Sequence, residues 1–428
     1  MSVTYRVKGG KQLQGTVFIQ GAKNSALPMI GAALMASKGR TVLRNIPIIE
    51  DVKRAVELAQ AVGAKADLHE AERTLVIDAS ELSSPVLPAE IAARFRGSFL
   101  FVPALLHRLG EAVIEGVGGC NLGSRNLDFH YNGFKRMGAT VTEHDTDSAD
   151  GGYIHVKVGQ LQAGTLYCDT PSHTGTENLV MAGALANGTT LIKNCALEPE
   201  VLDNIDFLQR MGAQIEGGGT GFIRVTGVEE LTAVEHTVMP DRIDAGVLVM
   251  ACAMTGGEVS LVGAELEHLG VAVDKLEQMG VEFNQQGAVL QVRRDRPLRP
   301  INIITDEYPG FATDLQSPIM ALATQAVGES YIYERIFDSR FQLAEELIRM
   351  GASIEVAGNQ RAKVYGPTPL RGAQTVAHDL RSGAALVLAG LAAEGETEIS
   401  QAYYIDRGHS NFAERLAALG ADVQRGTD

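Results

Sequence analysis

The fold is decided by the stretch Met181-Ala-Gly-Ala-Leu-Ala-Asn-Gly188-Thr-Thr-Leu-Ile-Lys-Asn194 and by Phe207-Leu-Gln-Arg-Met-Gly212-Ala, which follows it. A helix of small residues ends at a glycine, a short alternating strand follows, and a second helix ends at another glycine before the next strand. The first helices end at Gly39, Gly110, Gly188, Gly257, Gly328 and Gly395, and the second helices end at Gly63, Gly138, Gly212, Gly280, Gly351 and Gly420. Two independent glycine series thus keep a period of about 70 residues over six copies, which indicates an internal repeat.

Each copy is predicted to be a βαβαββ unit. In the third copy, the stretches that read as strands are residues 165–169, 189–194, 213–216 and 221–226. The segment Gly217-Gly-Gly-Thr-Gly221 supplies the hairpin connection between the last two strands, because a glycine-rich segment between two strand patterns is a turn signal.

The chain ends suggest how the six copies are grouped. The sixth copy lacks its last strand, whereas an extra strand at residues 5–9 precedes the strand at 16–20 that we expect to open the first copy. We therefore expect the extra strand to finish the sixth copy. This predicts one domain of residues 1–22 and 240–428, closed by both termini and holding copies four to six. Residues 23–239 would form the other domain, with copies one to three.

Composition excludes several classes of protein. A chain of 428 residues exceeds a comfortable single core, and 45% hydrophobic with 21% charged residues is ordinary for a globular protein. The net charge of -15 argues against a nucleic-acid partner, because phosphate backbones are bound mainly by Lys and Arg. The sequence shows no signal peptide and no apolar run long enough to span a membrane, so we expect a cytoplasmic protein. The four cysteines show no spacing of a zinc site or disulfide framework.

The starts of the small-residue helices carry an unusual set of polar side chains. Lys23 and Asn24 lie in the first turn of the first helix, where backbone N–H groups already favour an anion. In isolation, this pair reads equally as a surface lysine beside a capping asparagine. The equivalent starts carry Arg96, Ser98, Ser172, Thr176, Asp241, Arg242, Thr313, Asp314, Asp379 and Arg381. If the two domains face each other with these ends inward, they line a cleft suited to phosphorylated anions.

Three further positions have the residue types of a reactive site. Cys120 lies in a glycine-rich loop with Arg125 nearby, and a neighbouring cation favours the thiolate. The alternative is a loop cysteine without function. Asp314 follows a Pro/Gly turn and is either a functional carboxylate or a helix N-cap. Arg407 lies in the turn before the last helix, where it could simply be exposed to solvent.

These residues together resemble the enolpyruvyl transferases over essentially the full length. The motifs that carry the resemblance are Gly21-Ala-Lys23-Asn24-Ser-Ala-Leu-Pro28, Gly118-Gly-Cys120 with Gly123-x-Arg125, Phe311-x-Thr-Asp314, Asp379-Leu-Arg381 and Ile405-Asp-Arg407-Gly408. The resemblance implies an α/β (α+β) fold, a two-domain inside-out α/β barrel with three repeats in each domain and the active site between them. It implies no metal and no cofactor.

The implied reaction moves the enolpyruvyl group of phosphoenolpyruvate to the 3-hydroxyl of UDP-N-acetylglucosamine and releases phosphate, the first committed step of peptidoglycan precursor synthesis. By the same resemblance, Lys23, Arg125 and Arg407 would clamp phosphoenolpyruvate. Cys120 would be the general acid, and Asp314 would take the proton of the attacking hydroxyl. Substrate would also be bound by Asn24, Arg96, Asp128, Ser172, Ile336, Asp379 and Arg381.

Differences from the family's usual pattern leave other functions open. They fall at Asn126, His173, Thr174, Leu197 and His409, and the first three lie in segments that hold the nucleotide base in the family. One alternative is an enolpyruvyl transferase acting on another nucleotide such as uridine monophosphate, and a second is a non-catalytic regulator that binds UDP-sugars. The related shikimate-phosphate enzymes lack the cysteine loop. As partners we expect phosphoenolpyruvate and a UDP-sugar, with the chain a monomer or a weak homo-oligomer.

Overall fold

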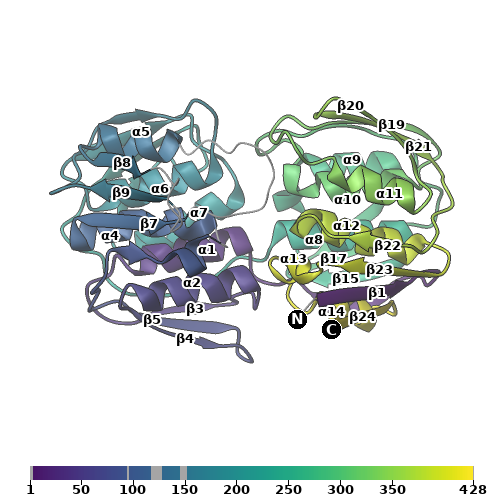
Figure 1. The fold of residues 1–428 in the computed structure, drawn as a ribbon, viewed down its shortest axis with the longest axis horizontal. Coiled ribbons are helices and arrows are strands. Elements are labelled where there is room, and N and C mark those ends of the chain that lie inside the picture. Colours follow the sequence, from purple (N-terminus) through teal and green to yellow (C-terminus); the bar gives the residue numbers. More distant parts are fainter. Residues whose placement is uncertain (1–2, 94–95, 117–127, 145–151, 428) are drawn as a thin grey trace. The chain divides into compact units, whose positions relative to one another are not determined.

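The computed structural model describes residues 3–93, 96–116, 128–144 and 152–427, without the side chains of Arg96 and Asp128. The described chain divides into two compact units (Figure 1). One comprises residues 3–20 and 240–427 and is called the terminal unit. The other comprises residues 21–116 and 128–239 and is called the central unit. No helix of the described chain has the length and apolar character needed to cross a membrane.

Within the described residues, each unit contains three four-stranded sheets built on one plan. The first strand pairs in parallel with the second, which pairs antiparallel with the fourth, and the third strand lies antiparallel at the other edge. The three sheets of the central unit have these strands, in order across each sheet. The first sheet has β14 (Glu235–Thr237), β3 (Thr41–Arg44), β5 (Thr74–Asp78) and β4 (Lys65–His69), and the second has β6 (Val86–Leu87), β7 (Glu111–Glu115), β9 (Tyr153–Lys157) and β8 (Thr140–His144). The third has β10 (Thr165–Tyr167), β11 (Thr189–Lys193), β13 (Phe222–Thr226) and β12 (Gln214–Glu216).

The terminal unit repeats this plan and uses both ends of the chain. Its strands are β2 (Gln14–Phe18), β15 (Glu258–Val262), β17 (Val289–Arg293) and β16 (Glu282–Gln286); β18 (Asn302–Ile304), β19 (Gly328–Tyr333), β21 (Arg361–Gly366) and β20 (Ser353–Ala357); β22 (Gln374–Val376), β23 (Glu396–Ser400), β1 (Val3–Lys8) and β24 (Asp422–Thr427). Strand β1 pairs with both β23 and β24. This confirms that the extra N-terminal strand finishes the sixth copy.

The prediction that residues 16–20 open the first copy is wrong. Strand β2 pairs in parallel with β15 of the fourth copy, and β14 opens the first copy by pairing with β3. Each of these two strands directly precedes a linker, so it pairs within the unit that the chain is about to leave. The repeat period could not reveal this exchange. Both strands occupy the same position in the repeat, directly before the first helix of a copy, so the period is the same whichever sheet each strand joins.

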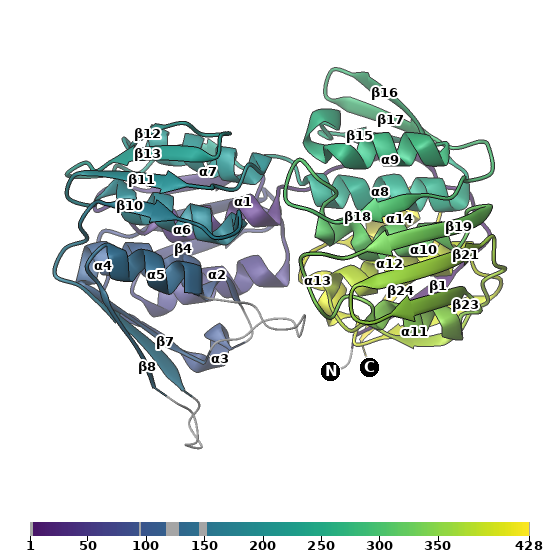
Figure 2. The same cartoon turned by 90° about the horizontal axis from the view of Figure 1, so that it is seen from above.

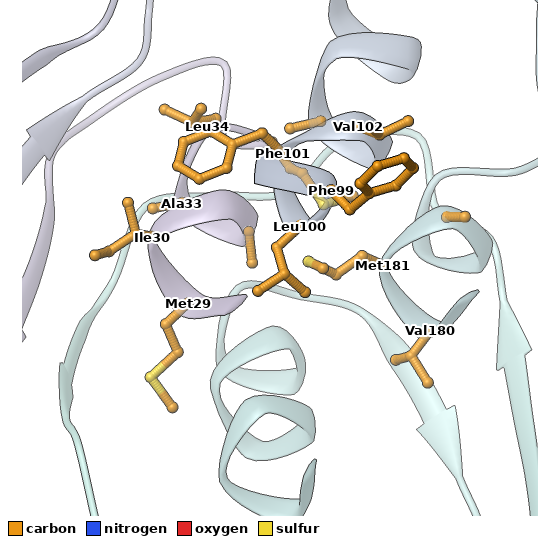
Figure 3. Packing of buried hydrophobic residues seen from close by; sticks show 14 of the residues in the cluster. Met29, Ile30, Ala33, Leu34, Phe99, Leu100, Phe101, Val102, Val180 and Met181 are labelled. Atoms are coloured by element: carbon orange, nitrogen blue, oxygen red, sulfur yellow. The ribbon is translucent and has the colours of Figure 1, made fainter. Parts of the chain in front are cut away.

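The helices of the central unit pack beneath its sheets. They are α1 (Lys23–Ala33), α2 (Glu50–Ala61), α3 (Ala89–Ala92), the 3-10 helix η1 (Arg96–Phe101), α4 (Val102–Leu109), α5 (Asp128–Arg136), α6 (His173–Ala184) and α7 (Pro199–Arg210). Two of them, α1 and α6, are rich in Ala and Gly. Figure 3 shows Met29 of α1, Leu100 of η1 and Met181 of α6 in the shared core. A Cβ on Gly31 of α1 would lie 2.4 Å from the Leu100 carbonyl oxygen, so only glycine permits this close approach.

The terminal unit has the same construction around three buried helices, α8, α10 and α12. Its helices are α8 (Arg242–Thr255), the 3-10 helix η2 (Leu266–Leu269), α9 (Val271–Met279), the 3-10 helix η3 (Thr313–Leu315), α10 (Gln316–Ala323), α11 (Gln342–Arg349), α12 (Leu380–Ala392), α13 (Tyr403–Asp406) and α14 (Phe412–Ala418). Helix α10 contacts β19 and β21, which lie outside it (Figures 1 and 2). With helices inside and sheets outside, each unit is an inside-out α/β barrel, as predicted.

The exchange of opening strands yields a first prediction. Val17 of β2 is buried and stands opposite Leu261 of β15. Val17→Ala should lower the free energy of unfolding of the terminal unit by about 2 kcal/mol, because it removes buried methyl groups and leaves a cavity. Hydrogen exchange monitored by mass spectrometry should show faster exchange in peptides covering β15 and unchanged exchange in peptides covering β3.

The matched control is Leu43→Ala in β3, a buried position whose partner in β14 is His236. It should weaken protection in the central unit and leave β15 unchanged. Loss of protection in β3 after Val17→Ala would instead place residues 14–18 in the first copy and contradict the exchange.

Candidate active site

In the central unit, Lys23 is held at the start of α1 by a buried carboxylate. Its Nζ lies 2.6 Å from Asp51 Oδ2, and the two side chains are 12% and 4% exposed. Asp51 lies in the first turn of α2, which packs against α1. The N-cap residue of α1 is Ala22, whose methyl side chain cannot accept a hydrogen bond, and the positive end of the helix dipole adds to the positive potential beside the ammonium group. The arrangement suits an anion. Asn24, also predicted to bind substrate, is half-buried in the same turn.

Asp51 was missed by sequence reasoning. An acidic residue in the first turn of a helix is what the helix dipole favours in any protein, so nothing local distinguished it. The only signal was its place in the first copy, shortly after the Lys23 helix. The pairing itself is a contact between two helices and cannot be read from either helix alone.

In the terminal unit, Asp314 lies in η3 between two arginines. Arg340 Nη2 donates to Asp314 Oδ1 over 2.7 Å, and Arg381 Nη2 donates to Asp314 Oδ2 over 2.7 Å. The arginine side chains are 3% and 5% exposed, whereas Asp314 is 24% exposed. A second Arg340 nitrogen donates to the Thr313 carbonyl. Both oxygens of the carboxylate are therefore fixed, while part of the side chain remains accessible to a ligand.

The charges around Asp314 determine its protonation. Burial by itself would raise the pKa of Asp314, but the positive charges of Arg381 and Arg340 outweigh burial and hold this pKa well below its usual range. Asp314 is therefore ionised at any physiological pH. Two guanidinium groups face this one carboxylate, and Asp241 and Asp379 also lie near enough to Arg381 to raise its pKa.

A second buried carboxylate shapes the segment between Asp314 and Arg340. Glu334 accepts hydrogen bonds from Thr313 Oγ1 over 2.9 Å and from the backbone N–H of Ile336 over 2.8 Å. Ile336, predicted to bind substrate, is half-buried in this turn. Glu334 thus ties the loop that bears Arg340 to the turn that bears Asp314. Like Arg340, it lies outside the motifs that the sequence singled out.

Two predicted substrate-binding residues serve as helix caps. Asp379 Oδ1 accepts from the backbone N–H of Arg381 over 2.7 Å and from that of Ser382 over 3.2 Å, at the start of α12. Ser172 Oγ accepts from the backbone N–H of Gly175 over 3.1 Å, at the start of α6. These bonds satisfy helix N–H groups that otherwise lack partners. A capping role explains both residue types, so their contact with substrate stays a prediction.

The remaining predicted residues divide into two groups. Arg407 directly follows α13 and is half-buried in the terminal unit. Cys120 and Arg125 lie outside the described residues, as do the side chains of Arg96 and Asp128. In the described part of the chain, no group of three or more His, Cys, Asp or Glu side chains could hold a metal ion.

His173, one of the departures from the family pattern, lies within a buried acidic cluster. Its Nε2 is 3.3 Å from Glu177 Oε1. Burial by itself would lower the pKa of His173, but the charges of Glu177, Glu198 and Glu200 outweigh it and raise the pKa to about 10. Burial raises the pKa of Glu177 to about 7. Three glutamates near the start of α6 therefore favour the protonated form of His173, which the sequence had marked only as a difference from the family pattern.

The comparisons with known proteins agree with this fold. A family model for EPSP synthase (3-phosphoshikimate 1-carboxyvinyltransferase) matches residues 7–416. The chain is 69% identical over 428 residues to a UDP-N-acetylglucosamine 1-carboxyvinyltransferase of Thermobifida fusca (strain YX), with 99% of this chain and 98% of that protein covered. It is 42% identical over 421 residues to a protein of the same name from Koribacter versatilis (strain Ellin345), with 98% of this chain and 95% of that protein covered.

Solved structures give the same result. The enolpyruvyl transferase NikO from Streptomyces tendae superposes with a TM-score of 0.89 at 27% identity, covering 100% of this chain and 99% of that chain. An EPSP synthase from Acinetobacter baumannii superposes with a TM-score of 0.74 at 18% identity and full coverage of both chains, which bears on the fold alone. The sequence match and the repeated inside-out barrels lead to one conclusion: the chain belongs to the EPSP synthase family of enolpyruvyl transferases.

Proposed function

We propose that this chain transfers the enolpyruvyl group of phosphoenolpyruvate to the 3-hydroxyl of UDP-N-acetylglucosamine and releases phosphate. The observation that carries the proposal is 69% identity, over 99% of the chain, to a relative named for that reaction. A difference in acceptor between two proteins of such identity would require the acceptor-binding segments to diverge while the rest stayed alike. The ammonium group of Lys23 and the guanidinium groups of Arg340 and Arg381 support an anionic substrate.

In the proposed mechanism, each reacting atom has an assigned group. Lys23, Arg125 and Arg407 hold the phosphate and carboxylate of phosphoenolpyruvate. Cys120 protonates C3 while the acceptor oxygen bonds to C2, and Asp314 takes the hydroxyl proton. In the second stage the Cys120 thiolate takes a proton back from C3, the bond between C2 and the phosphate oxygen breaks, and the double bond re-forms, while the proton that Asp314 took from the hydroxyl leaves with the phosphate. Substrate atoms are conserved, and phosphate is the only group released.

The depressed pKa of Asp314 bears on when this carboxylate accepts the hydroxyl proton. Such a carboxylate is a weak base toward a neutral hydroxyl group. Once the acceptor oxygen has bonded to C2 it carries positive charge and becomes strongly acidic, so that even a weak base can remove its proton. We therefore infer that Asp314 first orients the hydroxyl and accepts the proton late, after protonation at C3 has made C2 electrophilic.

Several finer points belong to the same proposal. We infer that the substrates are contacted by Asn24, Arg96, Asp128, Ser172, Ile336, Asp379 and Arg381. We also infer that the two functional domains are residues 1–22 with 240–428 and residues 23–239. The enzyme is inferred to be a cytoplasmic monomer or weak homo-oligomer.

The acceptor is tested most directly by measuring phosphate release from phosphoenolpyruvate with UDP-N-acetylglucosamine, UDP-glucose, UDP and uridine monophosphate. Turnover with uridine monophosphate but not with the UDP-sugar would contradict the proposed acceptor.

A prediction concerns the proposed base. Asp314→Asn should reduce kcat by about 10²- to 10⁴-fold, the usual effect of losing a general base. Binding of UDP-N-acetylglucosamine, measured by calorimetry, should remain. The variant should also melt at a lower temperature, because it leaves the buried guanidinium groups of Arg340 and Arg381 facing a neutral amide.

The matched control for this stability effect is Glu346→Gln. Glu346 is a buried carboxylate of the same unit, 3.3 Å from His378 Nε2 and 3.7 Å from Arg349 Nη2. Its neutralisation should lower the melting temperature without changing kcat. Wild-type turnover in a folded Asp314→Asn variant would remove Asp314 from the mechanism.

Another prediction uses the phosphonate epoxide fosfomycin, which should alkylate Cys120 alone. Its phosphonate should occupy the proposed cation clamp with its strained ring facing the thiol. The other cysteines are buried, and burial raises the pKa of Cys168 to about 11 and those of Cys195 and Cys252 to about 12. The thiolate is the nucleophile, so these three thiols should not react.

Intact-mass measurement and peptide mapping test this prediction, with and without UDP-N-acetylglucosamine. One adduct on the Cys120 peptide is expected, formed faster with the nucleotide sugar bound, and none on a Cys120→Ser variant. An adduct on another cysteine, or none under either condition, would show that Cys120 does not meet an anion site.

A further inference from the structure

The turn that carries Arg407 is fixed on its N-terminal side by the two end strands of the chain. The carboxylate of Asp406 accepts a hydrogen bond from Tyr5 Oη over 3.1 Å and from Arg425 over 2.9 Å and 3.1 Å. Tyr5 in β1 and Arg425 in β24 stand directly opposite each other in the sheet. The carboxylate of Asp406, the residue directly before Arg407, is thereby bonded to both strands.

On the C-terminal side, the amide of Gln20 holds the backbone of the same turn. Gln20 Nε2 donates to the Gly408 carbonyl over 2.8 Å, and Gln20 Oε1 accepts from the Ser410 N–H over 2.7 Å. Gln20 is almost fully buried and follows β2. Its own carbonyl accepts from the backbone N–H of Asp241 over 2.8 Å, so it also connects this turn to the start of α8.

The side chain between these two bonds, His409, is anchored on a buried ion pair. His409 Nδ1 lies 3.0 Å from Asp244 Oδ1, and Arg415 donates to both oxygens of Asp244 over 2.7 Å and 2.6 Å. Burial raises the pKa of Asp244, but Arg415 and His409 outweigh it and hold this pKa below its usual range. Burial lowers the pKa of His409, and Nδ1 is the donor of this bond because the ionised carboxylate of Asp244 can only accept.

We infer that Asp406, His409 and Gln20 are positioning residues that hold Arg407 ready for the anionic substrate. The inference rests on the proposed function, in which Arg407 binds phosphoenolpyruvate. Directional bonds on both sides fix the backbone of the turn before the substrate arrives. The binding energy is then not spent on ordering a mobile turn, and preorganisation of this kind raises affinity. A purely structural clamp would stabilise the turn without affecting one substrate more than the other.

The decisive variant is His409→Phe. It removes the Nδ1 donor but keeps a ring beside Phe412, whose ring centroid lies 4.8 Å from that of His409. Asp244 retains both bonds to Arg415, so the variant should fold. The KM for phosphoenolpyruvate should rise about tenfold, the order expected for a lost hydrogen bond to a charged group, with the KM for UDP-N-acetylglucosamine unchanged. His409→Asn should restore most of the affinity, because its amide nitrogen can take the place of Nδ1.

The central unit offers a matched control in His236→Phe. His236 is also buried, lies 2.8 Å from Asp203 Oδ1 and packs on Phe207 with ring centroids 5.5 Å apart. We expect His236→Phe to lower the melting temperature about as much as His409→Phe does, because each variant removes one buried hydrogen bond to a carboxylate. Unlike His409→Phe, it should leave both KM values unchanged. Gln20→Met, which removes both backbone bonds to the turn, should repeat the selective effect of His409→Phe.

Arg407→Lys separates the inference from the proposed function. If wild type turns over and Arg407→Lys raises the KM for phosphoenolpyruvate, but His409→Phe and Gln20→Met behave like His236→Phe, the positioning role is overturned and the function stands. If Arg407→Lys itself leaves that KM unchanged, the assigned role of Arg407 fails and the inference falls with it. A wild-type protein that releases no phosphate from phosphoenolpyruvate with any of the four acceptors would overturn the proposed function.

Discussion

The architecture depends on two parallel strand pairs, β2 with β15 and β14 with β3. Each pair completes a sheet with a strand that lies next to a linker: β2 joins the N-terminal segment to the terminal unit, and β14 brings the last residues of the central unit back to β3 near its beginning. The constraint reaches the candidate site, because Gln20 lies two residues beyond β2 and contacts the turn that carries Arg407. The side chain of Gln20 bonds the backbone of Gly408 and of Ser410.

The sequence predicted the repeat well because glycine has a local physical role. The second helix of each copy ends at or beside a glycine with a positive φ, as at Gly280, Gly351 and Gly420, so the period is visible without any knowledge of packing. The prediction that the first helices end at the other glycine series is wrong in most copies: α6 ends at Ala184 and α12 at Ala392, before Gly188 and Gly395. Strand exchange left no such mark. The partner of β2 depends on the unit in which this strand lies. The sequence pattern of residues 14–18 fits the opening strand of the first copy as well as that of the fourth.

The site shows the same division between local and long-range information. Lys23, Asp314 and Arg381 were found from their places at helix starts, and helix capping explains Asp379 and Ser172 locally. Asp51, Arg340 and the contact of His409 with Asp244 were missed, since each is a pairing between segments far apart in the chain. A partner that neutralises a functional charge is chosen by geometry, and its residue type alone gives no signal among many exposed acids and bases.

These pairings solve an electrostatic problem that the function creates. An isolated buried charge is costly, yet a site for a phosphorylated anion needs cations with little water around them. Each unit compensates its charges internally: Lys23 with Asp51 in the central unit, and Asp314 with Arg340 and Arg381 in the terminal unit. In both units the partner of each of these charges therefore comes from the same unit, so the residues proposed to bind an anion are held in place by contacts that form when that unit folds.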